Sequence, residues 1–152
     1  ELPDGATSFF AGAAADPNCK SLSGLKRRLE LKKKAGVKFL QTQMIMEPKI
    51  LESFCKEIAN PLELPVLAGV FLLKSAKNAK FINKVVPGAC IPDSIICRLN
   101  EAKDPSKEGI LIAAEQAKQF LKFAKGIHIM AIKAEHKIPE ILEKAEIKLQ
   151  RS

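Results

Sequence analysis

The chain has 152 residues, 47% of them hydrophobic and 28% charged, with a formal net charge of +8. This size fits a single domain, residues 1–152, with a buried core, and no apolar run approaches the roughly 20 residues that a membrane-spanning helix needs. No signal peptide is visible, and the four cysteines and two histidines lack metal-ligand spacing, so we expect a cytoplasmic protein without disulfides or a metal.

The first apolar run, residues 7–15, is expected to form a buried parallel strand. Its small residues, Ala14 among them, would let a flat ligand approach the backbone, and a closely packed core strand would explain them equally well. Asp16 follows at the carboxyl end of this strand, in a turn with Pro17 and Asn18.

Residues 21–34 are predicted to form an amphipathic helix, because leucines recur at three and four while basic residues occupy the other face. That basic face, which includes Arg28 and Lys32, favours a phosphate, a polyanionic cofactor or a nucleic acid as partner. A solvated lysine-rich helix face is the simpler alternative. Tyr and Trp are absent, and no aromatic residues alternate with the basic ones to form stacking platforms for bases, so we expect no nucleic acid as partner.

The stretch 35–43 is predicted to complete one helix-to-strand step. Gly36 can end the helix in a left-handed conformation, and residues 37–40 then form a short buried strand. Gln41, Thr42 and Gln43 follow where that strand is expected to end. Because ligands bind at the carboxyl ends of parallel strands, these polar side chains mark a candidate binding site.

The rest of the chain continues the alternation of strands and helices. Further strands are expected at 64–73 and 127–132. Further helices are expected at 48–60, after Ser75, from Asp93, at 105–124 and at about 139–149.

The order is therefore strand then helix four times, with two extra helices before the fourth strand. Such alternation predicts an α/β fold with parallel strands and right-handed crossovers. Four units of this kind are half of an eightfold βα (TIM) barrel. A four-stranded open sheet covered by helices is the alternative.

Several segments together resemble one family, methylenetetrahydrofolate reductase. In chain order they are Ala13–Pro17, Lys32 with Ala35-Gly36 and Thr42-Gln43, Pro65–Val70, Pro87–Asp93 and Gly126–His128. The match runs over nearly the whole chain in the family's order, and residues 87–93 resemble the branch found in acetogens and related anaerobes.

This resemblance implies a flavin-dependent (FAD or FMN) reduction of methylenetetrahydrofolate to methyltetrahydrofolate. It assigns Gln43, with Thr42 and Met130, to the folate substrate, and a side-chain amide matches the amide-like edge of a pterin. It also assigns a second set of residues to the flavin. These are Ala14, Asp16, Arg28 and Lys32.

The departures from the family define the expected partners. The family's catalytic Glu and its flavin-tuning Asp lie in a preceding barrel half and have no counterpart here. We therefore expect this chain to be the carboxyl-terminal half of a reductase, as a fragment or paired with an amino-terminal half or a second copy. A Tyr and an Arg of the family's last strand are replaced by Met130 and Ala134, which favours an electron-donor protein over a nicotinamide.

Two other functions stay open at this stage. One is a non-catalytic half-barrel that binds flavin or folate or serves in assembly. The other is a basic α/β domain that binds nucleic acid, for which no recognition motif is present.

Overall fold

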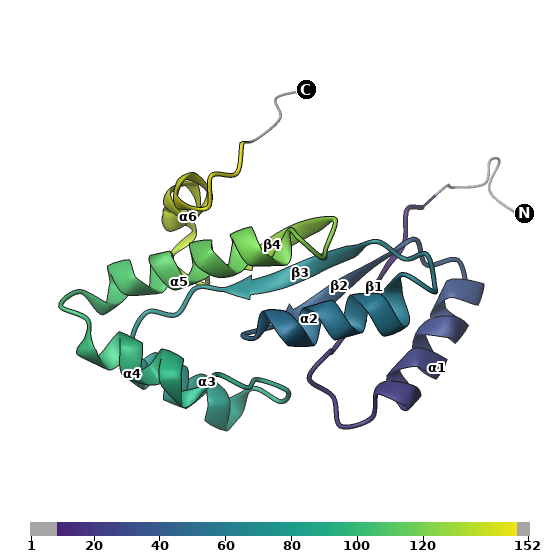
Figure 1. Ribbon diagram of the computed structural model, residues 1–152, viewed down its shortest axis with the longest axis horizontal. Coiled ribbons are helices and arrows are strands. Elements are labelled where there is room, and N and C mark those ends of the chain that lie inside the picture. The colour runs from purple at the N-terminus through teal and green to yellow at the C-terminus, as the bar shows by residue number, and fades with distance from the viewer. Residues whose placement is uncertain (1–8, 149–152) are drawn as a thin grey trace, which may run out of the picture.

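The structure, a computed structural model, describes residues 9–148 and contains one four-stranded parallel sheet (Figure 1). The strands are β1 (Gly12–Ala15), β2 (Phe39–Met44), β3 (Val66–Phe71) and β4 (Gly126–Met130). They lie side by side in chain order, and each neighbouring pair is parallel. The predicted α/β fold is thereby confirmed, and the arrangement is consistent with half of a TIM barrel.

Helices connect the strands, and three of them begin at a residue whose side chain caps the helix. The helices are α1 (Leu22–Lys34), α2 (Pro48–Phe54), α3 (Ala76–Val85), α4 (Asp93–Glu101), α5 (Pro105–Phe120) and α6 (Ile138–Lys144). A π-helical turn, η1 (Cys55–Ala59), extends α2, and a 3-10 turn, η2 (Glu135–Lys137), precedes α6. Ser21, Ser75 and Asp104 each accept a hydrogen bond from a backbone N–H in the first turn of the helix that follows.

The main core lies between one face of the sheet and the layer formed by α1, α2, α5 and α6. Leu29, Leu40, Leu51 and Ile110 are almost completely buried there, and each such side chain stabilises the fold by about 1.5–3 kcal/mol. A smaller cluster joins α3 and α4 to the end of β3, where Leu73 is buried. Figure 1 shows these two helices beyond the arrowhead of β3.

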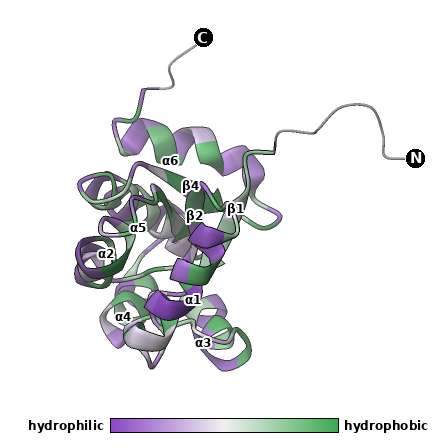
Figure 2. Cartoon of the chain, turned by 90° about the vertical axis from the view of Figure 1, so that its right-hand side faces the viewer, coloured by the Kyte–Doolittle hydropathy of each residue, from purple (hydrophilic) through white to green (hydrophobic). Residues whose placement is uncertain are grey.

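The opposite face of the sheet, which we call the inner face, is largely open. Gly12, Ala14 and Gln41 are exposed on it, and Phe39 and His128 are half-buried. Figure 2 shows that the apolar colouring gathers in the strands, while α1 carries much of the hydrophilic colouring. The sheet is thus packed on its outer face and accessible on its inner face.

The second strand is longer than predicted. It continues to Met44, so Gln41, Thr42 and Gln43 lie within β2 and not beyond its end. The polar residues are compatible with a strand because Gln41 lies on the open inner face while Thr42 is buried in the sheet. The first strand is shorter than predicted, since it begins at Gly12.

Other boundaries differ by a few residues. Phe9 and Phe10 were expected inside the first strand, but they precede it and are 81% and 75% exposed. Helix α5 ends at Phe120, although Ala124 remains buried as expected. β4 begins at Gly126 and ends at Met130. The last helix was expected over about 139–149, whereas α6 begins at Ile138 and ends at Lys144. The predicted start of the first strand at 7–8 lies outside the described residues.

Within residues 9–148, no helix combines the length and the apolar character that crossing a membrane requires.

Candidate functional site

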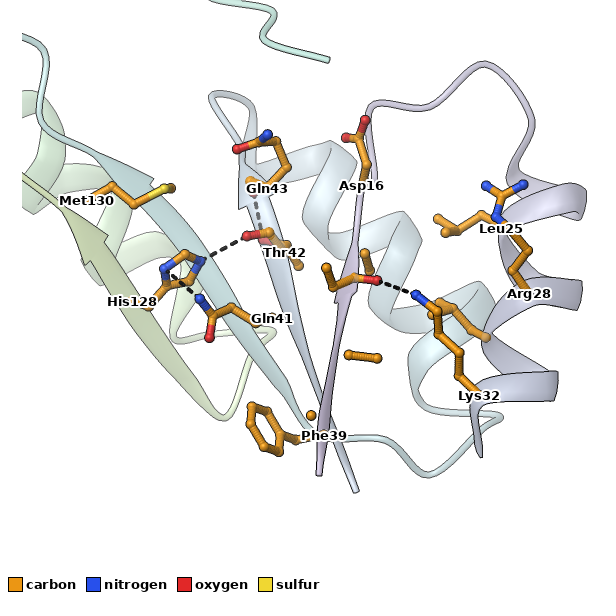
Figure 3. Close-up of a pocket in the computed structure, with 15 residues that line it drawn as sticks. Asp16, Leu25, Arg28, Lys32, Phe39, Gln41, Thr42, Gln43, His128 and Met130 are labelled. Carbon is orange, nitrogen blue, oxygen red and sulfur yellow. Dashed lines mark hydrogen bonds between the residues drawn. The ribbon is translucent and has the colours of Figure 1, made fainter. Parts of the chain in front are cut away.

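A cavity of about 700 Å³ opens between the inner face of the sheet and one side of α1. All seven residues that the family resemblance assigns to folate or flavin line it: Ala14, Asp16, Arg28, Lys32, Thr42, Gln43 and Met130. They come from β1 and the turn that follows it, α1, β2 and β4, and Figure 3 labels all of them except Ala14. Residues more than 100 positions apart in the sequence therefore share one concave surface.

The α1 side of the cavity is cationic. Arg28 and Lys32 are one helical turn apart, so their side chains lie on the same side of α1. Lys32 Nζ lies 3.1 Å from the carbonyl oxygen of Ala14 and donates a hydrogen bond to it. Two cationic groups beside a cavity form an environment that suits a phosphate or carboxylate.

The small residues of β1 have two different explanations. A Cβ atom at Gly12 would lie 2.3 Å from the ring of Phe39, so this ring covers the strand there and would have to shift to admit a side chain. Phe39 stacks in turn on Phe10, with ring centroids 5.6 Å apart. The flat group over Gly12 is therefore the protein's own aromatic ring, whereas Ala14 is open to the cavity.

Asp16 contributes the carboxylate among the residues that line this cavity. Its Oδ1 accepts a hydrogen bond of 3.0 Å from the backbone N–H of Asn18, which is the local turn expected of this residue. Gly88, with a φ of +80°, packs against Asp16 so closely that a Cβ atom there would lie 2.5 Å from Oδ2. The loop between α3 and α4 thus reaches the carboxyl end of β1.

Thr42 lies in a β-bulge, where β2 has one residue more than β3 between matched positions. Its hydroxyl accepts a hydrogen bond of 2.9 Å from the N–H of Gly69 and donates one of 2.8 Å to the carbonyl oxygen of Gln43. The side chain therefore replaces a missing rung of the strand ladder. Bulges of this kind commonly lie beside binding sites and redirect the neighbouring side chain.

The neighbouring side chain is Gln43, which follows the bulge and lines the cavity. Its Oε1 accepts a hydrogen bond of 3.0 Å from the backbone N–H of Met44. Within the described part of the chain, its Nε2 has no hydrogen-bond partner. The free end of this amide is therefore a donor.

Two further residues line the cavity: Gln41, which was marked as part of the polar strand end but assigned to no ligand, and His128, which was not predicted as a site residue. His128 Nε2 donates a hydrogen bond of 2.8 Å to the carbonyl oxygen of Thr42, and its Nδ1 lies 3.3 Å from Gln41 Nε2 (Figure 3). The strand period could have revealed Gln41, because alternation places it on the same face as Gln43 once β2 is extended. The same period could have revealed His128, because it lies two residues before Met130 on the same face of the last strand. Its hydrogen bond to Thr42, about 85 residues away in the chain, had no local signal.

Met130 borders the cavity from β4 and also packs against the smaller core cluster. The chemistry available in the cavity is thus a cationic side, one carboxylate, an imidazole and two amides. These groups suit the binding of a polar, flat molecule that also carries negative charge.

Comparisons with known proteins agree with this architecture. A sequence model described as methylenetetrahydrofolate reductase matches residues 7–146. A solved structure of an uncharacterized protein from Clostridium thermocellum that binds two copies of 5-methyl-5,6,7,8-tetrahydrofolic acid has a similar fold, with a TM-score of 0.65 and 17% sequence identity. The similarity covers 88% of this chain and 51% of the other, so the chain spans about half of that structure. Comparison with curated protein sequences gives no match.

Proposed function

The chain belongs to the methylenetetrahydrofolate reductase family, and from that premise we propose that it binds a reduced folate in the cavity of its inner face. The observation that carries this proposal is the Gln43 amide, whose oxygen is held by Met44 while its Nε2 is left as a donor beside the cavity. A pterin ring offers a carbonyl acceptor for such a donor.

The finer form of the proposal is a flavin-dependent reduction of 5,10-methylenetetrahydrofolate to 5-methyltetrahydrofolate. The side chains fit the phosphate end of FAD or FMN, because Arg28 and Lys32 place two cationic groups on the α1 side. Ala14 is small and open to the cavity, so together with Asp16 it would border the ring. When bound, a flavin would supply the hydride, and the protein would supply binding and orientation.

A second half-barrel is part of this proposal. The inner face leaves Gln41 and Ala14 exposed, whereas a closed barrel packs its inward side chains in layers. A partner with four further βα units, or a second copy of this chain, would cover this face, and a partner of the first kind would add the catalytic Glu, whereas the described cavity lining offers Asp16 as its carboxylate. An electron-donor protein is the proposed source of reducing equivalents.

The test of folate binding is calorimetric titration of the full chain with 5-methyltetrahydrofolate. Replacing Gln43 by Leu is expected to weaken binding about tenfold, the effect of one lost hydrogen bond to a buried ligand. Gln119→Leu is the matched control, because Gln119 is exposed on α5 and does not line the cavity. Absence of binding by the unmodified chain, or equal losses in both variants, would contradict the proposal.

The flavin part has its own test. The purified chain is incubated with FMN or FAD and passed through a gel-filtration column. A yellow protein that releases flavin on denaturation would support the reductase function. Colourless protein that still binds folate would instead favour the second candidate, a non-catalytic folate-binding half-barrel, which the scarcity of carboxylates in the cavity makes a specific alternative. Native mass spectrometry of the same sample reports whether a second copy is bound.

A further inference from the structure

We propose that Gln41 and Gln43 form a pair of oppositely directed amides that selects the 4-oxo edge of a pterin, and that His128 is the positioning residue that sets the direction of Gln41. This inference rests on the proposed folate binding and deepens it. Both amides line the same cavity from β2, and two steps along a strand separate their Cα atoms by about 7 Å.

The direction of the Gln43 amide is set by the backbone. Its Oε1 accepts from the N–H of Met44 at 3.0 Å. The end that faces a ligand is therefore Nε2, a donor. A carbonyl oxygen on the ligand is its natural partner.

The direction of the Gln41 amide is set by His128. Because the carbonyl oxygen of Thr42 can only accept, the His128 Nε2 that lies 2.8 Å from it must carry the proton. In the neutral imidazole the other nitrogen, Nδ1, is then an acceptor, and it takes an N–H from Gln41 Nε2 at 3.3 Å. Gln41 Oε1 is left as an acceptor.

The sheet is built so that this contact can form. His128 is the register partner of Gly69, and β3 lies between β4 and β2. Since Gly69 has no side chain, the imidazole can extend over β3 and reach β2. The bulge at Thr42 provides a carbonyl oxygen that the β3 ladder does not use, because the Gly69 N–H donates to the Thr42 hydroxyl instead.

The pair therefore presents one donor, Gln43 Nε2, and one acceptor, Gln41 Oε1. A 4-oxo pterin has the complementary pattern, with a C4 carbonyl that accepts and an N3–H that donates. In the 4-amino counterpart both groups are reversed, since C4 carries an amino donor and N3 has no hydrogen. The inference predicts that the protein binds the 4-oxo form more tightly.

The experiment compares the affinities of the full chain for 5-methyltetrahydrofolate and for its 4-amino counterpart. The wild-type chain is expected to prefer the 4-oxo form by at least tenfold, about one well-formed hydrogen bond. His128→Lys keeps a donor for the Thr42 carbonyl but has no acceptor to offer Gln41. This variant is expected to lose about tenfold of the preference, because the Gln41 amide can then turn either end to the ligand.

A second variant guards against a folding defect. Gln41 is exposed, so Gln41→Met is expected to fold normally and to lose the same preference. The double variant should lose no more than either single variant, because both act through one acceptor. A purely structural role of His128 would instead weaken both ligands equally and leave their affinity ratio unchanged.

The outcomes separate the two proposals. Failure of the wild-type chain to bind either ligand contradicts the proposed function itself. Binding without a preference for the 4-oxo form, or a preference that survives in both variants, overturns the amide pair and leaves folate binding intact. Loss of the preference in His128→Lys and Gln41→Met supports the inference.

Discussion

Lys32 Nζ donates a hydrogen bond of 3.1 Å to the carbonyl oxygen of Ala14, on the free edge of the sheet. The carbonyl of Ala11 faces β2, because it accepts from the N–H of Lys38 at 2.8 Å. The two-residue period of a strand therefore turns the Ala14 carbonyl away from β2. In a closed barrel a neighbouring strand would pair with this edge, and its N–H groups would compete with Lys32 for that oxygen. Lys32 would then be released toward a ligand.

Replacing Lys32 by Met is therefore expected to reduce FMN affinity about tenfold, since a charge-assisted hydrogen bond to the phosphate is lost. Lys34→Met is the matched control, because it removes the same charge from the same last turn of α1 outside the cavity. Thermal unfolding should differ little between the two variants, since both side chains are exposed. Equal losses of FMN affinity would show that only the net charge matters.

Thr42→Val is expected to destabilise the fold by about 1–3 kcal/mol, although it preserves the size of the side chain. In the wild-type chain the N–H of Gly69 donates a hydrogen bond of 2.9 Å to the Thr42 hydroxyl. The Val variant leaves this N–H buried without a partner. Thr42→Ser keeps the hydroxyl and should recover most of this loss. Urea unfolding of the three proteins measures the difference. A Val variant as stable as the Ser variant would mean that the bulge does not depend on this hydroxyl.

Gly69→Ala tests the close approach of β3 to the bulge. The added Cβ would lie 2.7 Å from the carbonyl oxygen of Gln43 and 2.9 Å from that of Thr42. The backbone must shift to accommodate it, and such overpacking lowers the free energy of unfolding by about 1–3 kcal/mol. Gly24→Ala is the control, because its nearest atom is the Ser21 hydroxyl at 3.1 Å and alanine in a helix gains about 0.5–1 kcal/mol. The two substitutions should therefore shift the unfolding midpoint in opposite directions.

Local signals in the sequence were sufficient for most of the fold. Ser21, Ser75 and Asp104 cap the helices that follow them, as their residue types predict. The order of strands and helices was equally accessible, because apolar runs and the three-four repeat are local patterns. The parallel pairing then followed from the connection rules.

The details of the site depended on contacts between distant strands. The predicted end of the second strand at residue 40 was wrong because polar residues were taken to end a buried strand. Gln41 instead lies on an inner face that is open. The His128–Thr42 hydrogen bond depends on the register of β3 with β4 and on a bulge in β2. Neither the register nor the bulge can be predicted from the spacing of residues within a single segment.

Besides the smaller apolar cluster, an arginine connects α4 to α5. Arg98 on α4 donates to both carboxylate oxygens of Glu115 on α5, at 2.6 and 2.8 Å, and also to Glu108. The hydrogen bonds from Arg98 lower the pKa of Glu115 below its usual value. These contacts of Arg98 also help to position the cavity lining, because the loop between α3 and α4 places Gly88 against Asp16.

Arg98→Met is therefore expected to lower the free energy of unfolding by about 1 kcal/mol at neutral pH, a modest value because the pair is partly exposed to solvent. Since the pKa of Glu115 is lower in the folded than in the unfolded chain, its stabilisation is present above the unfolded pKa and is lost as the pH falls through the folded pKa. The difference between wild type and variant should accordingly shrink in acid. Urea unfolding over a pH series measures it, with Lys107→Met as the control, whose exposed pair with Asp104 spans 3.9 Å. A difference that stays constant with pH would assign the effect to lost packing of the Arg98 stem and not to the ion pair.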